Sequence, residues 1–234
     1  MTPISPVRPV WAAAASLNAI WVATGESPEW IASRTDVFLA KLTSALAITS
    51  WETPQHQEWR GTPEVLANIV RSHVTTSTFG DPEPESGYLF TVSGTGSEAA
   101  LHVQISAGSQ SKGRRLPLHT IAIDIREVAP GGVTAETGDI LCAAVAEAWT
   151  PAALSLSDLT VNRTARRGGW KIPVGYRTWV SSEIGSIPQL AEGLTSTKVA
   201  AGTLISAPDD WLADRVVATM TTTLAANGLD EIPH

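Results

Sequence analysis

The most regular pattern in the chain lies between residues 28 and 47, where apolar side chains recur at helical spacing. The segment opens with Ser27-Pro28-Glu29, which supplies a hydroxyl cap, a proline in the first helical position and an acid in the first turn. Thr62-Pro63-Glu64 repeats this opening before a shorter apolar face. The sequence therefore predicts a long helix over 28–47 and a shorter helix over roughly 63–74.

A different pattern, in which apolar and polar residues alternate, follows in the middle of the chain. It is clearest at Leu101-His102-Val103-Gln104-Ile105-Ser106, where the alternation is typical of a half-buried strand. Strands are also expected over 88–92 and 118–125, and short turns join the three. Because short connections favour antiparallel pairing, these segments predict a meander. A further strand is expected over 16–24.

The remaining segments complete the predicted fold. Two more helices and two more strands are expected at 137–149 and 208–226, and at 174–180 and 199–206. The fold class is therefore α+β, with a mainly antiparallel sheet of about six strands and three to four helices packed on it. One domain is expected over 16–234, after an extended tail over 1–15 that contains three prolines.

The strongest charge in the sequence lies in the polar, proline-bearing segment 75–87, which predicts a surface loop. Asp81, Glu83 and Glu85 fall within five residues of one another there. The formal net charge of the chain is −7. A nucleic-acid binder usually has a basic surface, so this charge argues against nucleic-acid binding. An acidic surface attracts basic partners, including basic proteins, and it also serves solubility alone.

Tryptophan is the second unusual feature, with nine residues against three phenylalanines and two tyrosines. Most of these rings must lie in the core, because each carries a large apolar area. A minority can be exposed, and exposed tryptophan is enriched at binding hot spots. Trp51 and Trp59 fall in the loop predicted over 50–62 and are the better interface candidates, whereas Trp179 falls in the middle of a strand.

The sequence also indicates in which cellular compartment the protein is expected. No stretch reaches the roughly 18 apolar residues that a transmembrane helix needs. Ser16 and Asn18 interrupt the N-terminal apolar run, which favours a buried strand over a signal peptide. Cys142 is the single cysteine and lies among apolar residues, so a buried, unreactive thiol is expected. We therefore expect a cytoplasmic protein that does not bind membranes.

One glycine-rich segment resembles a nucleotide-binding motif. Gly94-Thr95-Gly96-Ser97-Glu98-Ala99 matches the dinucleotide fingerprint and follows a predicted strand. The chemistry requires a helix next, whose N-terminal amides hold the pyrophosphate. The residues that follow alternate with a period of two instead. The segment therefore predicts a hairpin turn.

The histidines offer little sign of catalysis. None of the five has another ligand at a spacing typical of metal sites. His102 and His119 fall in predicted strands and could face each other. We expect no catalytic residue, no metal and no cofactor. Two alternatives remain open, an enzyme of unfamiliar type with one of these histidines in a cleft, and a small-ligand-binding domain.

The C-terminal third resembles a known family. The pattern consists of Gly169-Trp170, then Val174-Gly175-Tyr176-Arg177-Thr178-Trp179, then Gly202-Thr203-Leu204-Ile205, and a last helix that ends at Asn227-Gly228-Leu229. With the strand that carries Trp21 and the long helix that carries Phe38, it is similar to the immunity protein 52 family of bacterial polymorphic toxin systems. The similarity runs from about residue 16 to residue 229. The chain differs in its acidic segment and in Tyr176, where a tryptophan is expected.

The resemblance implies an antitoxin-type immunity protein that binds and neutralises a cognate toxin by occlusion. The toxin it implies is a nuclease effector with a restriction-endonuclease-like fold. A nuclease presents a basic surface to nucleic acid, and an acidic inhibitor can dock there by charge complementarity. The predicted partner-binding residues are Trp51, Trp59, Asp81, Glu83, Glu85, Trp170, Tyr176 and Trp179.

Overall fold

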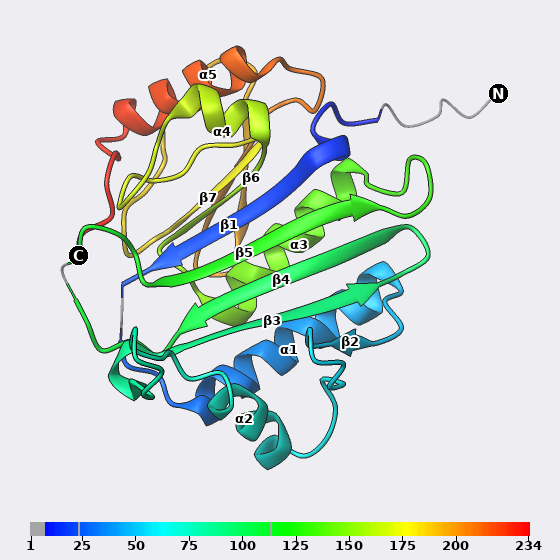
Figure 1. The fold of residues 1–234 in the computed structure, drawn as a ribbon. Coiled ribbons are helices and arrows are strands. Elements are labelled where there is room, and N and C mark those ends of the chain that lie inside the picture. The colour runs from blue at the N-terminus through cyan, green and yellow to red at the C-terminus, as the bar shows by residue number, and fades with distance from the viewer. Residues whose placement is uncertain (1–7, 23, 113) are drawn as a thin grey trace.

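Residues 8–22, 24–112 and 114–234, which the computed structural model describes, form one antiparallel sheet of nine strands and five α-helices (Figure 1). The spatial order of the strands is β2-β3-β4-β5-β1-β6-β7-β9-β8. In chain order they are β1 (Ala15–Trp21), β2 (Trp51–Glu52), β3 (Tyr88–Thr95), β4 (Ala99–Ala107), β5 (His119–Glu127), β6 (Ala153–Asp158), β7 (Arg177–Ser181), β8 (Thr195–Val199) and β9 (Gly202–Ser206). The α+β class and the antiparallel sheet are confirmed, but the described chain has more strands than the six expected.

The first two helices begin where the capping pattern predicts. The Ser27 hydroxyl accepts the backbone N–H of Trp30 at 3.3 Å, and the Thr62 hydroxyl accepts that of Val65 at 3.4 Å. The α-helices are α1 (Pro28–Leu46), α2 (Pro63–Arg71), α3 (Ala135–Trp149), α4 (Leu159–Ala165) and α5 (Ala213–Ala226), and two 3₁₀ turns are η1 (Ala12–Ala14) and η2 (Pro84–Ser86). Within the described residues, no helix combines the length and the apolar character that crossing a bilayer requires.

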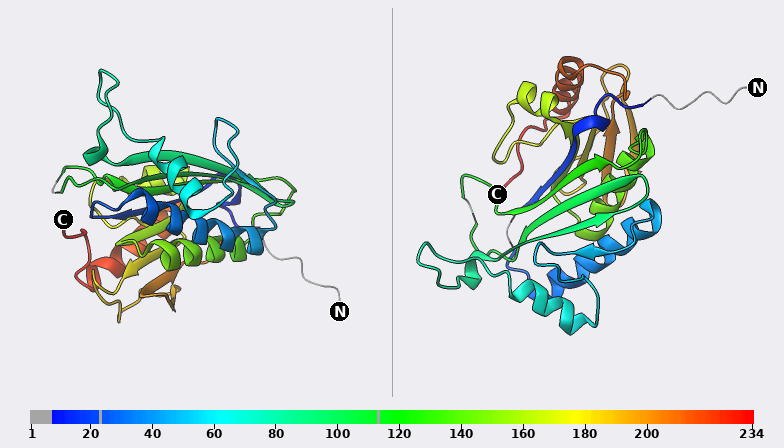
Figure 2. Two further views of the ribbon diagram at one scale, coloured as in Figure 1. Left: turned by 90° about the horizontal axis from the view of Figure 1, so that it is seen from below. Right: turned by 45° about the vertical axis from the view of Figure 1, so that its right-hand side comes forward.

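Helices α1 and α3 lie side by side against one face of the sheet, and α2 packs on α1 (Figure 2). The strands point their apolar side chains toward this layer. The buried residues that do so include Leu17, Phe90, Val92, Leu101, Val103, Ile105, Ile121, Ile123, Ile125 and Leu154. The period-two alternation read from the central strands is therefore the alternation between this buried face and the other one.

The opposite face is covered only in part. Helices α4 and α5 lie over the C-terminal strands, whereas β3, β4 and β5 have no helix on this side (Figures 1 and 2). We name this uncovered area the open face. Its residues are Leu89, Thr91, Ser93, Thr95, Ala100, His102, Gln104, Ser106, Thr120, Ala122, Asp124 and Arg126. Most of them are polar, as expected for the solvated side of an antiparallel sheet.

Three strands and one helix are absent from the sequence prediction. Strand β6 lies in the middle of the sheet with five of its six residues buried, so it shows no alternation. Strand β8 is polar and exposed along its length, and β2 has only two residues. The strand predicted over 199–206 is present as β9, and the missed strand β8 forms a hairpin with it. Helix α4 has seven residues, too few for a periodic pattern.

The extended tail predicted over 1–15 is wrong for the part that the structure describes; residues 1–7 lie outside it. Trp11 is fully buried, a 3₁₀ turn follows it, and β1 already begins at Ala15. The indole N–H of Trp11 donates to a carboxylate oxygen of Asp209 at 2.7 Å, and the backbone N–H of Val10 donates to the Asp209 carbonyl at 2.9 Å. This segment is thus an integral part of the domain.

A buried arginine joins the C-terminal strands to the rest of the molecule. Arg177 in β7 is 4% exposed, and its Nε donates to Asp139 of α3 at 2.6 Å. Its two terminal nitrogens bind the two oxygens of Asp209, at 2.9 and 3.1 Å. Because Asp209 serves Arg177 and Trp11, it does not cap a helix. Helix α5 begins at Ala213, five residues later than the predicted start at 208.

Replacing Arg177 with methionine should lower the free energy of unfolding by about 3 kcal/mol, because two carboxylates lose their common cation. Asp139→Asn is the matched control, since Asp139 is half exposed and water can replace its partner. That variant should lose at most about 1 kcal/mol. Urea denaturation at pH 7 measures both. A loss below 1 kcal/mol in the arginine variant would contradict the role assigned to this network.

Candidate protein-binding surface

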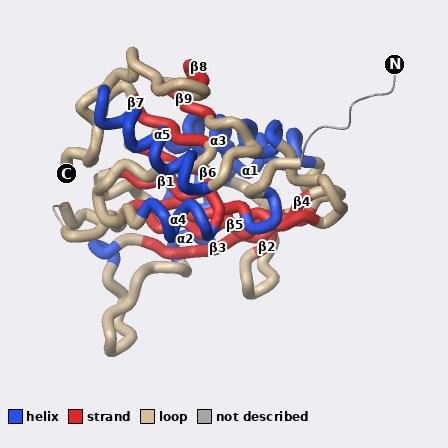
Figure 3. The backbone as a smooth tube through the Cα atoms, turned by 90° about the horizontal axis from the view of Figure 1, so that it is seen from above, coloured by secondary structure: helices blue, strands red, loops and turns tan. Residues whose placement is uncertain are grey.

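The segment that joins α2 to β3 projects from the molecule as a narrow hairpin (Figure 3). Isolated β-bridges pair Val74 with Tyr88 at its base and Thr76 with Pro82 farther out. We name residues 74–88 the acidic finger. The surface loop predicted here is confirmed, and its backbone pairing gives it a defined conformation.

The acidic finger carries the three predicted acids. Asp81 and Glu85 are exposed, and Glu83 is half-buried. The Ser86 hydroxyl donates to the carboxylate of Glu83 at 3.2 Å. The backbone N–H of Gln110 donates to the carbonyl of Glu85 at 3.0 Å, which ties the base of the finger to the β4–β5 loop. The structure therefore brings the three acids together on one projection.

Charge is distributed unevenly along the chain. Residues 24–98 contain ten acids and four basic residues, so six of the seven net negative charges fall in this segment. It comprises α1, β2, α2, the acidic finger and β3. These elements are neighbours at one end of the sheet (Figure 1). Most of the net negative charge of the chain therefore falls in the elements at this end of the sheet.

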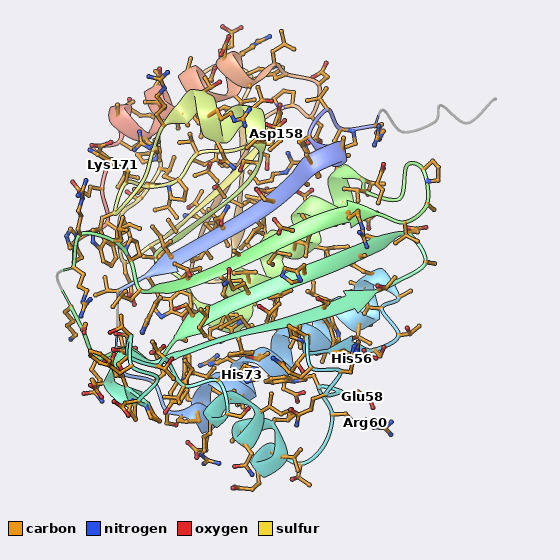
Figure 4. All side chains as sticks on the ribbon, in the orientation of Figure 1. His56, Glu58, Arg60, His73, Asp158 and Lys171 are labelled. Atoms are coloured by element: carbon orange, nitrogen blue, oxygen red, sulfur yellow. The ribbon has the colours of Figure 1, made fainter. Side chains whose placement is uncertain are left out.

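A second projection borders the same region. The loop between β2 and α2 carries His56, Glu58 and Arg60 (Figure 4). It and the acidic finger both project from the sheet on the side away from α1 and α3 (Figures 2 and 3). Strand β2 pairs with one end of β3, at Ser93 and Gly94, and the finger enters the other end. The two projections therefore flank the open face.

The predicted aromatic anchors in the loop over 50–62 are buried, which corrects the expectation that they are exposed. Trp51 is 5% exposed, and its indole N–H donates to the Thr43 hydroxyl of α1 at 2.9 Å. Trp59 is 7% exposed and stacks on Phe90 of β3 at 5.7 Å. Trp51 lies in β2 itself, and the backbone N–H of Trp59 donates to the Trp51 carbonyl at 2.8 Å. Both rings therefore stay at the base of the projecting loop, where their apolar area is removed from water.

The three anchors predicted in the C-terminal third are buried as well. The indole N–H of Trp170 donates to the carbonyl of Arg114 at 2.7 Å, and that of Trp179 to the carbonyl of Val199 at 2.9 Å. The Tyr176 hydroxyl donates to the Trp211 carbonyl at 3.0 Å, and burial raises the pKa of Tyr176 to about 12. These rings satisfy their polar atoms inside the domain, as core residues do.

The most exposed large apolar side chain in the described part of the chain is one that the sequence reasoning missed. Phe79, at the tip of the acidic finger, is 91% exposed. The signal was available, since Phe79 is a lone aromatic residue in a polar, proline-bearing segment. Nine tryptophans dominate the aromatic composition, so a single phenylalanine does not stand out in it.

The glycine motif forms the β3–β4 hairpin, as predicted. Both glycines are required by close contacts. A side-chain carbon on Gly94 would lie 2.7 Å from the Trp51 ring, and one on Gly96 would lie 2.4 Å from the Leu46 carbonyl oxygen. The glycines therefore let the hairpin pack against β2 and the end of α1, and their spacing has a packing reason of its own.

His102 and His119 do not face each other, contrary to expectation. His102 lies on the open face, whereas His119 points to the buried face and is fully buried. The Ser93 hydroxyl lies 2.9 Å from Nδ1 of His102. These two residues, with Asp124 and Arg126, line a shallow hollow of about 330 Å³. Among residues 8–22, 24–112 and 114–234, no group of three His, Cys, Asp or Glu side chains could hold a metal ion.

The prediction that the Cys142 thiol is buried is confirmed. Cys142 is 0% exposed in α3, and burial raises its pKa to about 12. A thiol with such a pKa is almost entirely protonated at neutral pH, and the thiolate is the reactive form.

Comparison with known proteins identifies no family. No family model matches the chain, and no curated protein matches it. Among solved structures, the fold is similar to one described as Pseudomonas aeruginosa T6SS protein PA0821, with a TM-score of 0.46 and 11% sequence identity. The alignment covers 82% of this chain and 64% of that chain.

His119 gives the chain a testable pH dependence. Burial lowers the pKa of His119, and the Glu26 carboxylate, whose Oε2 lies 3.4 Å from Nδ1, opposes this only in part. The unfolded chain therefore takes up a proton, below about pH 6.5, that the folded chain excludes. The free energy of unfolding should therefore be highest above about pH 6.5 and should decrease as the pH falls through this value.

The measurement is urea denaturation of the wild type and of His119→Gln at pH 7.0 and 5.5. The wild type should lose up to about 1 kcal/mol more than the variant on this change of pH. Equal losses in the two proteins would mean that His119 is already free to protonate in the fold.

Proposed function

We propose that this chain is an immunity protein of the kind its sequence resembles, which binds a cognate toxin and catalyses no reaction itself. The observation that carries the proposal is the acidic finger, a hydrogen-bonded projection with three acids in the segment of the chain that holds most of the net negative charge. A toxin that cleaves nucleic acid has a basic active-site surface, because it must attract a polyanion.

Occlusion follows from this complementarity. The acids of the finger occupy the basic surface in place of phosphate groups, so substrate and inhibitor exclude each other. Charge complementarity of this kind raises the association rate and the specificity of binding. The flanking β2–α2 loop extends the contact beyond the finger itself, since a stable complex needs roughly 800 Å² from each partner.

The aromatic residues predicted as anchors are buried, so they do not contact the toxin directly. Trp51, Trp59, Trp170, Tyr176 and Trp179 act from the core, where they hold the strands and loops that carry the acids. Trp59, for example, packs on β3 and fixes the loop that ends next to α2. Their substitution would weaken binding by disturbing the fold, not by removing direct contacts.

A small polar ligand is the second candidate, and the hollow on the open face favours it. Ser93, His102, Asp124 and Arg126 offer a hydroxyl, an imidazole, a carboxylate and a guanidinium within one shallow depression. His102→Ala discriminates between the two candidates. Under the immunity proposal this variant neutralises the toxin as the wild type does. The ligand candidate is favoured if the wild-type chain neutralises no toxin but binds a small polar ligand that His102→Ala no longer binds, with an unchanged melting temperature.

The immunity proposal is tested by co-purifying the chain with the product of the neighbouring gene and assaying the nuclease activity of that product. Replacing Asp81, Glu83 and Glu85 together with lysine should weaken the complex about tenfold or more, mostly through slower association. The loss should shrink at high salt, because salt screens exposed charges.

The matched control reverses three exposed acids elsewhere, Glu183, Glu192 and Asp210. This variant has the same net charge as the finger variant, so it separates the position of the acids from their number. Equal affinity losses in the two variants would show that only total charge matters. A wild-type chain that neither binds nor silences the neighbouring product would overturn the immunity proposal.

A further inference from the structure

Phe79 lies at the tip of the acidic finger, where the rest of the described chain covers almost none of its surface. Its side chain is 91% exposed, more than any other large apolar residue there. The other two phenylalanines, Phe38 and Phe90, are 0% and 2% exposed. Phe79 therefore contributes almost nothing to the core and is available for contact with another molecule.

The tip that carries Phe79 is held by its own hydrogen bonds. The Ser77 hydroxyl accepts the backbone N–H of Phe79 at 3.1 Å and that of Asp81 at 3.2 Å. The backbone N–H of Ser77 donates to the Asp81 carbonyl at 2.8 Å, and that of Gly80 donates to the Ser77 carbonyl at 3.0 Å. Gly80 has a φ of +88°, which a glycine adopts without strain and which closes this turn.

The finger is also fixed to the body of the molecule. The backbone N–H of Thr75 donates to the Gly87 carbonyl at 2.9 Å, and that of Leu89 donates to the His73 carbonyl at 3.0 Å. The ring at the tip is thus presented on a pre-organised support. Little conformational entropy remains to be lost when such a ring is bound, and this favours affinity.

We infer that Phe79 is the apolar anchor of the acidic finger and inserts into an apolar pocket of the partner whose rim carries lysine or arginine. The inference rests on the proposed function and adds to it the residue that makes the central contact. Asp81 lies two residues after Phe79 in the sequence, and Glu83 and Glu85 lie closer to the base of the acidic finger. An aromatic anchor inside a ring of charged contacts is the arrangement expected of a hot spot, in which the surrounding polar groups exclude water.

The partner is thereby restricted in chemistry. A smooth basic surface of the kind that binds nucleic acid would satisfy the acids but would leave the phenyl ring in water. The partner must instead combine positive charge with a cavity large enough for a phenyl ring, such as the entrance of an active-site cleft.

Because the chain has three phenylalanines, NMR can follow the solvent exposure of each phenyl ring separately. When the chain is labelled with 4-fluorophenylalanine, fluorine NMR should give two resonances from buried rings and one that responds to replacement of H₂O by D₂O. On addition of the neighbouring gene product, the resonance of Phe79 should shift and lose this solvent response. Those of Phe38 and Phe90 serve as internal controls and should move little. A Phe79 resonance that keeps its solvent response in the complex would overturn the inference.

The energetic test is Phe79→Ala, which should weaken the complex about 10- to 100-fold and leave the melting temperature unchanged. Leu212→Ala is the matched control, since Leu212 is 77% exposed and lies at the start of α5. It should change neither quantity. If Phe79→Ala binds as the wild type does while the three-lysine variant is weakened, the anchor is refuted and the proposed function stands. If the wild type binds no neighbouring product, both are refuted.

Discussion

Apart from His119, the buried side chains that point from β1, β3, β4 and β5 toward α1 and α3 are apolar. Burial of this face is the constraint on which the other features depend, because the hydrophobic effect is the dominant favourable contribution to folding. It fixes the register of the central strands, since a shift by one residue would turn every apolar side chain outward. It also leaves the other face of β3, β4 and β5 free, and the two projecting loops are placed at the ends of β3 by that same register.

The C-terminal strands depend on a second, polar interaction. Arg177 is the common partner of a carboxylate from α3 and one from the segment before α5, and Trp11 shares the latter carboxylate. Three parts of the chain that are far apart in sequence therefore meet at one guanidinium. A planar group with five donors suits this position, because lysine offers only a compact point charge.

How much of this structure the sequence could predict depends on the local signals. The caps at Ser27 and Thr62 and the alternation over 101–106 are local, and the elements they predict are present. Strand β6 could not be found, because a strand covered on both faces has no alternation to read. For the candidate site, the charges of the finger follow directly from composition. The burial of Trp51 and Trp59 does not, because it depends on how a loop folds back onto α1 and β3.

The two edges of the sheet give the molecule a further property. One edge strand, β2, has two residues, and the other, β8, is a short polar segment that carries Lys198. Short or charged edges resist the addition of a foreign strand, which is a common route to aggregation and also a common mode of peptide recognition. These two edge strands therefore offer little to an added strand. The segments that project farthest from the sheet are the acidic finger and the β2–α2 loop, and neither lies in an edge strand.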